Sequence, residues 1–116
     1  MDFYSTRDDS ERATVSEAIS RGLAPDGGLY VPEELPAIDP GAFADDDPIE
    51  QIAERALAPF FEADELEGEL GDVCRATFDF PVPVTRVGES LRVLELFHGP
   101  TAAFKDVGAR FLAECL

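Results

Sequence analysis

Lys105 is the residue of this sequence whose type and setting most clearly suggest chemistry. The chain has nine basic side chains in 116 residues, and all the others are arginines. A lysine amine can lose its proton and attack a carbonyl carbon to form a Schiff base, whereas an arginine stays protonated. Because most lysines are simply solvated surface groups, residue type alone leaves both a catalytic and a surface role open.

The neighbours of Lys105 favour the chemical interpretation. Phe104 precedes it directly, after the small residues Ala102 and Ala103, at a predicted junction of strand, loop and helix. Apolar surroundings favour the neutral form of an amine, which is the nucleophilic form. The pattern therefore makes Lys105 a candidate for covalent attachment of a carbonyl-containing ligand.

Three polar residues lie close to Lys105 in the sequence, and each has two interpretations. His98 could hydrogen-bond a cofactor or substrate, or could tie the end of the strand to the backbone. Thr101 could contact an anionic substrate through its hydroxyl, or could cap the helix that carries Lys105. Asp106 is expected to favour the first turn of that helix through its charge.

The elements that position these residues follow from hydrophobic spacing. Apolar and β-branched runs at 84–87 and 91–97, separated by Gly-Glu-Ser, predict a β-hairpin. Residues 98–101 break the second strand, and the spacing of apolar residues from Phe104 to Leu116 predicts a helix. That pattern reaches the last residue without a capping signal, so we expect a fragment of a longer protein.

The predicted C-terminal helix has an apolar side formed by Val107, Phe111 and Leu112. We expect this side to pack against a part of the protein that lies outside this sequence. Short helices are marginal in water without such packing, and exposed apolar stripes promote association. The sequence thus predicts that in the isolated chain this helix is loosely ordered or associates with the same helix of a second copy.

The first half of the sequence contains signals for one helix and one strand. Thr14 and Glu17 have the spacing of a capping box, and Gly22 lies where the helix would end. Turn residues from Ala24 to Gly28 then precede a short predicted strand at 29–31.

Two further helices are predicted after a proline-rich loop at 32–48. For the first, Asp47 is the predicted cap, Pro48 the first helical residue, and Pro59 the limit. For the second, apolar spacing predicts a start near Asp64. The whole pattern is that of an α/β chain with helices and a β-hairpin.

Two segments resemble the same known family. The stretch from His98 to Asp106, HGPTAAFKD, is similar to the cofactor-lysine motif of threonine synthases. The stretch from Gly22 to Pro32, GLAPDGGLYVP, resembles the opening signature of that family, and Phe80 to Pro83 fits between the two. Val107 stands where a larger aromatic residue is expected, a difference that concerns local packing.

The resemblance implies an enzyme that uses pyridoxal 5'-phosphate, with the fold type II architecture of the tryptophan synthase β-chain. Residues 1–92 would form the N-terminal domain, and residues 93–116 would begin the catalytic domain. Lys105 would hold the cofactor and move protons during conversion of O-phospho-L-homoserine and water to L-threonine and phosphate. His98 and Thr101 would lie near the substrate. A lyase for another phosphorylated amino acid and a non-catalytic binding module remain alternatives.

The sequence lacks one part that this chemistry requires. Backbone N–H groups of a glycine-rich loop usually hold the cofactor phosphate, and the only adjacent glycine pair, Gly27–Gly28, is followed by Leu-Tyr-Val-Pro. We therefore expect the 116 residues to be inactive alone.

Composition excludes several other classes of protein. Twenty-five acidic residues against nine basic ones give a net charge of -16, which disfavours binding to nucleic acids and anionic membranes. The acidity fits either a well-solvated surface or adaptation to high salt. The absence of a signal-peptide pattern or a long apolar run predicts a cytoplasmic protein. The single histidine, and the spacing of Cys74 and Cys115, predict no metal site.

Overall fold

The computed structural model describes all residues from 1 to 116, beginning with a small antiparallel sheet. Its strands are β1 (Phe3–Ser5), β2 (Arg12–Ala13) and β3 (Tyr30–Pro32), in the order β2-β1-β3. Phe3 lies opposite both Ala13 and Pro32, which places β1 in the centre. The strand predicted at 29–31 is confirmed with a shift of one residue, whereas β1 and β2 were not anticipated.

Helix α1 (Val15–Arg21) begins with the predicted capping box. The backbone N–H of Glu17 donates to the Thr14 hydroxyl at 3.3 Å, and the N–H of Thr14 donates to the Glu17 carboxylate at 3.0 Å. Gly22 ends the helix with a φ of 73°, a conformation that glycine adopts without steric cost. The sequence signals at both ends of α1 are therefore confirmed.

Helix α2 (Ile49–Phe61) follows a loop that contains the short 3₁₀ helix η1 (Pro40–Ala42). The prediction that Asp47 caps α2 is wrong, because Pro48 occupies the cap position and no side chain caps the helix. The Asp47 carboxylate instead accepts hydrogen bonds from Ala44 N, at 3.0 Å, and from Arg55 Nη1, at 2.7 Å. Asp47 thus joins the preceding loop to the second turn of α2.

The ends of the next two helices also differ from prediction. Helix α2 continues through Pro59 for two residues, because a proline in the last turn disturbs only bonds near the helix end. The helix predicted near Asp64 begins as the 3₁₀ helix η2 (Glu67–Glu69) and continues as α3 (Leu70–Thr77). The α-helical part therefore starts later than the apolar spacing indicates.

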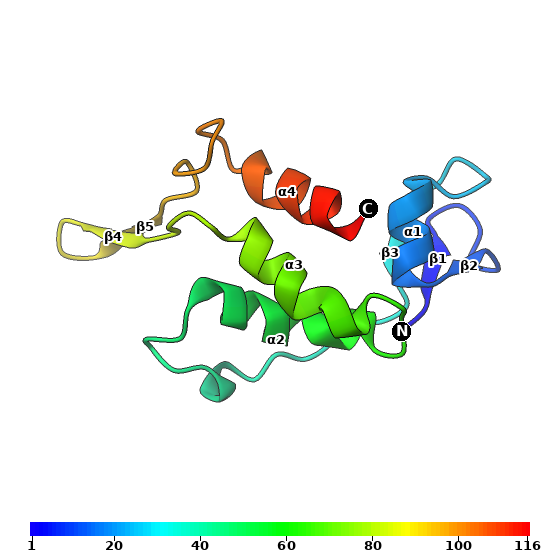
Figure 1. Ribbon diagram of the computed structural model, residues 1–116, viewed down its shortest axis with the longest axis horizontal. Coiled ribbons are helices and arrows are strands. Elements are labelled where there is room, and N and C mark those ends of the chain that lie inside the picture. Colours follow the sequence, from blue (N-terminus) through cyan, green and yellow to red (C-terminus); the bar gives the residue numbers. More distant parts are fainter.

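The last elements are a β-hairpin and a helix. Strands β4 (Val84–Val87) and β5 (Leu91–Leu94) pair antiparallel, with Val84 opposite Leu94, so the predicted hairpin is confirmed but ends before Phe97. Helix α4 (Lys105–Cys115) follows after an irregular loop. In Figure 1 the hairpin projects from one end of the molecule, while α1 and the three-stranded sheet lie at the other end.

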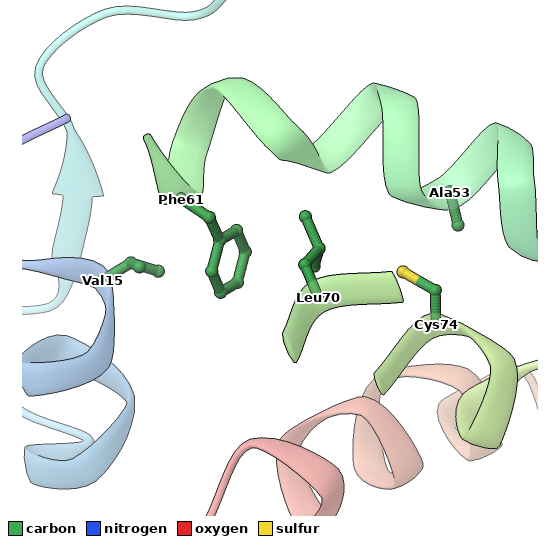
Figure 2. Packing of buried hydrophobic residues seen from close by; sticks show 5 residues of the cluster. All are labelled: Val15, Ala53, Phe61, Leu70 and Cys74. Carbon is green, nitrogen blue, oxygen red and sulfur yellow. The ribbon is translucent and has the colours of Figure 1, made fainter. Parts of the chain in front are cut away.

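A small hydrophobic core joins three helices. Figure 2 shows Val15 of α1 facing Phe61 at the end of α2, with Leu70 and Cys74 of α3 and Ala53 of α2 continuing the cluster. Each of these side chains is at most 9% exposed. Helix α3 therefore packs against α2 through this core, and α4 lies along another side of α3.

Helix α4 packs against α3 within the chain. Phe111 lies against the hydrophobic core, and the Arg110 guanidinium donates to the carbonyls of Ala76, at 2.8 Å, and Thr77, at 3.2 Å. The prediction that the apolar side of this helix needs a partner outside the sequence is therefore wrong for Phe111. Leu112 remains 45% exposed. None of the helices combines the length and apolar character needed to cross a membrane.

Candidate active site

Lys105 is the first residue of α4, where the loop that follows β5 enters the helix. Its side chain is exposed and lines a cavity of about 490 Å³. The cavity is mainly apolar, and its other lining residues come from four parts of the chain: Ile49, Phe78, Val82, Leu94, Leu96, Phe104, Val107 and Gly108. The fold thus places the one lysine amine beside an apolar surface built by α2, α4 and both ends of the hairpin region.

The first part of the loop is held by Glu95 and His98. His98 Nε2 lies 2.6 Å from the Glu95 carboxylate, and its ring lies against Phe97 with centroids 4.6 Å apart. Hydrogen bonds from the Thr85 hydroxyl and from His98 lower the pKa of Glu95. Glu95 therefore connects strand β4 to the histidine, which gives His98 a structural contact beside any role toward a ligand.

The second part of the loop is held by Asp106. The backbone N–H of Thr101 donates to Asp106 Oδ2 at 2.8 Å, and the Thr101 hydroxyl donates to Oδ1 of the same carboxylate. The hydrogen bond from the Thr101 hydroxyl is the largest contribution to the lowered pKa of Asp106. The sequence predicts only an effect of the Asp106 charge on the helix and does not predict this pair. The signal that could have indicated it is the presence of a threonine five residues before the aspartate.

The arrangement fits one part of a site for pyridoxal 5'-phosphate. Lys105 supplies an amine that can bond to an aldehyde carbon, and the apolar wall can cover one side of a planar ring. The chain has no glycine-rich loop to hold the phosphate group. The residues present would therefore hold the reactive end of the cofactor and leave its phosphate to other residues. No three His, Cys, Asp or Glu side chains converge on a point where a metal could bind.

The predicted site residues all lie in one short segment. Lys105, Thr101 and His98 belong to the loop between β5 and α4 or to the first turn of that helix. Asp106 connects Thr101 to the helix of Lys105, whereas His98 is connected to Glu95. The loop before α4 is therefore held at two places, near His98 by Glu95 and near Thr101 by Asp106.

Comparison with known proteins gives matches along the whole chain. A sequence profile described as the threonine synthase N terminus matches residues 2–78. The chain is 34% identical to threonine synthase of Haemophilus influenzae, covering 100% of this chain and 27% of the relative. It is 38% identical to threonine synthase of Serratia marcescens, covering 100% of this chain and 28% of the relative.

Solved structures show the same fold at this level of similarity. A crystal structure of threonine synthase from Escherichia coli superposes with a TM-score of 0.90 at 34% identity, over 100% of this chain and 28% of that one. A crystal structure of threonine synthase from Brucella melitensis with bound PLP gives a TM-score of 0.86 at 34% identity, over 98% of this chain and 26% of that one. The chain therefore spans about a quarter of the length of the proteins it matches.

Proposed function

This chain belongs to the threonine synthase family, as an N-terminal part, and from that premise we propose that the protein containing it converts O-phospho-L-homoserine and water to L-threonine and phosphate. The observation that carries the proposal is the position of Lys105. The one lysine of the chain begins α4 beside an apolar cavity, within the segment that resembles the family's cofactor-lysine motif.

Lys105 is assigned two tasks in this proposal. Its Nζ would hold the cofactor at the aldehyde carbon, and its free amine would give and accept protons at the substrate carbons. Pyridoxal 5'-phosphate, when bound, supplies an electron sink for the carbanionic character that develops during elimination and hydration. The apolar wall formed by residues such as Leu94, Leu96 and Phe104 keeps water away from one side of that site.

His98 and Thr101 are proposed to contact the substrate because they lie in the loop that leads to Lys105. A hydroxyl has one proton, and Thr101 donates its proton to Asp106. Donation by this hydroxyl to an anionic substrate would therefore require the bond to Asp106 to open. His98 has a second ring nitrogen beside the one that contacts Glu95, and that nitrogen is its means of reaching a ligand.

The proposal also assigns the parts of the chain. Residues 1–92 form the N-terminal domain, and residues 93–116 begin the catalytic domain of a cytoplasmic enzyme. The phosphate site and the opposite wall of the cavity belong to residues outside this segment. The 116 residues alone should therefore be inactive.

The test is an assay of the full-length protein with O-phospho-L-homoserine and pyridoxal 5'-phosphate. We expect L-threonine and phosphate in equal amounts, and loss of both in the Lys105→Arg variant, because a guanidinium cannot bond to the cofactor aldehyde. Formation of a keto acid and phosphate would instead indicate a lyase that degrades a phosphorylated amino acid rather than forming threonine. Binding of cofactor with no turnover of phosphorylated amino acids would indicate a non-catalytic module.

We further propose that the isolated chain self-associates through residues of α4 and its flanks. Leu112 is 45% exposed, Phe104 is 74% exposed and Leu116 is 77% exposed. Exposed apolar groups on one segment favour association, although the net charge of -16 opposes it at low salt. Light scattering of the isolated chain should show a larger mass at high salt, and a monomer at every salt concentration would contradict this.

A further inference from the structure

We propose that Asp106 is a positioning residue that anchors the loop 99–102 to α4 and thereby fixes where Lys105 presents its amine. The inference rests on the proposed role of Lys105 as the cofactor lysine. Asp106 itself touches neither cofactor nor substrate in this proposal; it acts through the backbone of the loop and the first turn of the helix.

The first observation is the burial of the Asp106 carboxylate. Asp106 is 5% exposed, whereas the adjacent Lys105 is exposed and lines the cavity. A carboxylate withdrawn from water needs directed hydrogen bonds to remain charged. Thr101 supplies two of these, from its backbone N–H at 2.8 Å and from its hydroxyl. Consecutive residues of α4 therefore have different surroundings: one faces the loop and the next lines the cavity.

The second observation is the close approach of the loop to this carboxylate. A Cβ atom added at Gly99 would lie 2.6 Å from Asp106 Oδ2 and 2.9 Å from Asp106 Cβ. Such distances are below any normal contact, so a larger residue at position 99 would force the Asp106 side chain or the loop to move. The loop backbone therefore lies directly on the Asp106 side chain, at a second point besides Thr101.

The third observation is the backbone conformation of the residue that directly follows these two contacts. Ala102 has a φ of 55°, in the left-handed region that residues other than glycine seldom adopt. Its N–H donates to the Gly99 carbonyl at 3.1 Å. A turn in this conformation persists when its surroundings hold it. Asp106 holds the residue before Ala102 through its carboxylate, which accepts from Thr101, and the residue after it through its backbone N–H, which donates to the Ala103 carbonyl at 3.1 Å.

These contacts differ from ordinary capping of a helix. Phe104 occupies the cap position of α4 without a side-chain hydrogen bond. The Asp106 oxygens reach back to Thr101, which precedes the helix by four residues. The carboxylate thus fixes the conformation of the loop that leads into α4. Lys105 is the first residue of that helix, so its position depends on this loop.

The chain offers a matched control for this arrangement at Asp64. The Asp64 carboxylate accepts hydrogen bonds from the backbone N–H of Ser16, at 3.1 Å, and from the Ser16 hydroxyl, at 2.9 Å. It therefore makes the same kind of contact as Asp106, but to α1 rather than to the loop before α4. The Asp64 carboxylate also accepts from the Leu66 N–H at 2.9 Å, so Asp64→Asn perturbs at least as many hydrogen bonds as Asp106→Asn, at a site that does not involve Lys105.

The experiment compares full-length wild type, Asp106→Asn, Thr101→Val and Asp64→Asn. Cofactor-free protein is titrated with pyridoxal 5'-phosphate by absorbance, and hydrogen exchange is measured across residues 99–105. We expect Asp106→Asn and Thr101→Val to weaken cofactor binding by about tenfold or more, the effect that follows when a hydrogen bond orienting a metal ligand is removed. Both variants should also speed hydrogen exchange in the loop. Because both changes break one pair, the double variant should bind no more weakly than Asp106→Asn.

Asp64→Asn should retain wild-type cofactor affinity and loop exchange, even where it lowers the melting temperature. Equal cofactor affinity in wild type and both loop variants would overturn the proposal, as would an equal loss in Asp64→Asn. If Asp106→Asn does not fold, Thr101→Val decides, because it removes the hydroxyl at nearly constant volume. Failure of the wild type to attach cofactor at Lys105 would instead overturn the proposed function, so the two failures are distinguishable.

Discussion

Phe111 of α4 sets its ring against Phe61 of α2, with ring centroids 6.1 Å apart and planes inclined by 73°. This is the edge-to-face geometry that aromatic pairs prefer. The contact is the aromatic link between the helix that carries Lys105 and the hydrophobic core. It connects the stability of the core to the position of the candidate site.

Replacing Phe61 should therefore destabilise the whole chain. Phe61 is 3% exposed, and removal of a buried phenylalanine side chain typically lowers the free energy of unfolding by about 3–5 kcal/mol. We expect Phe61→Ala to show a loss of this size in urea unfolding followed by circular dichroism. The control is Leu35→Ala, since Leu35 is 82% exposed and should change stability by about 0.5 kcal/mol or less. Similar losses in the two variants would contradict the described core.

Replacing Gly28 or Gly68 by alanine should change the free energy of unfolding in opposite directions. A Cβ atom at Gly28 would overlap the buried Ser5 hydroxyl, which donates to Asp26 at 2.8 Å. A Cβ atom at Gly68 would meet nothing within 4 Å. We expect Gly28→Ala to lower the free energy of unfolding by about 1–3 kcal/mol through overpacking. Gly68→Ala should be neutral or stabilising by up to about 1 kcal/mol.

Thermal unfolding of these two variants under the same conditions provides the measurement. The sign of the difference is the informative quantity, because both changes add one methyl group. A stable Gly28→Ala protein would show that the turn after Asp26 does not approach Ser5 as described.

Much of the local structure could be predicted from the sequence. The capping box at Thr14 and the glycine at position 22 determine α1 through local hydrogen bonds, and the alternation around Gly88 determines the hairpin. Signals of this kind involve residues a few positions apart. The segment proposed to hold the cofactor is distinctive in the sequence, because Lys105 is the one lysine in the chain.

The differences from prediction occur where contacts outside the local capping and spacing signals decide the structure. Strand β1 exists because Phe3 pairs with both Ala13 and Pro32, contacts that no local pattern reveals. Asp47 does not cap α2, because its carboxylate accepts a hydrogen bond from Arg55, a residue in the second turn of that helix. The sequence predicts for Asp106 only an effect of its charge on the helix, whereas its carboxylate is buried against the loop. Each case depends on a specific side-chain or strand contact that hydrophobic spacing and capping signals do not specify.

The buried thiol of Cys74 predicts a dependence of stability on pH. Burial raises the pKa of Cys74 to about 11 from an ordinary value of 9.0. Because the folded-state pKa lies above the unfolded one, this contribution to stability is fully present below pH 9.0 and is lost as the pH rises through about 11. Stability should therefore fall more steeply between these values in the wild type than in Cys74→Ala.

Urea unfolding at several pH values between 8 and 11 measures this difference. Other groups titrate in the same range, but they are common to both proteins and cancel in the comparison. Parallel curves for the wild type and Cys74→Ala would show that the thiol is not withdrawn from water. Alkylation by iodoacetamide offers a second check, since Cys74 should react slowly until the protein unfolds.

The central claim is that Lys105 holds the cofactor, and reductive trapping tests it most directly. The full-length protein, loaded with pyridoxal 5'-phosphate, is treated with borohydride, digested and analysed by mass spectrometry. The account predicts that the reduced cofactor is found on the peptide containing Lys105 and is lost from that peptide in Lys105→Arg. Stoichiometric labelling of a different lysine, with the Lys105 peptide unmodified, would contradict it.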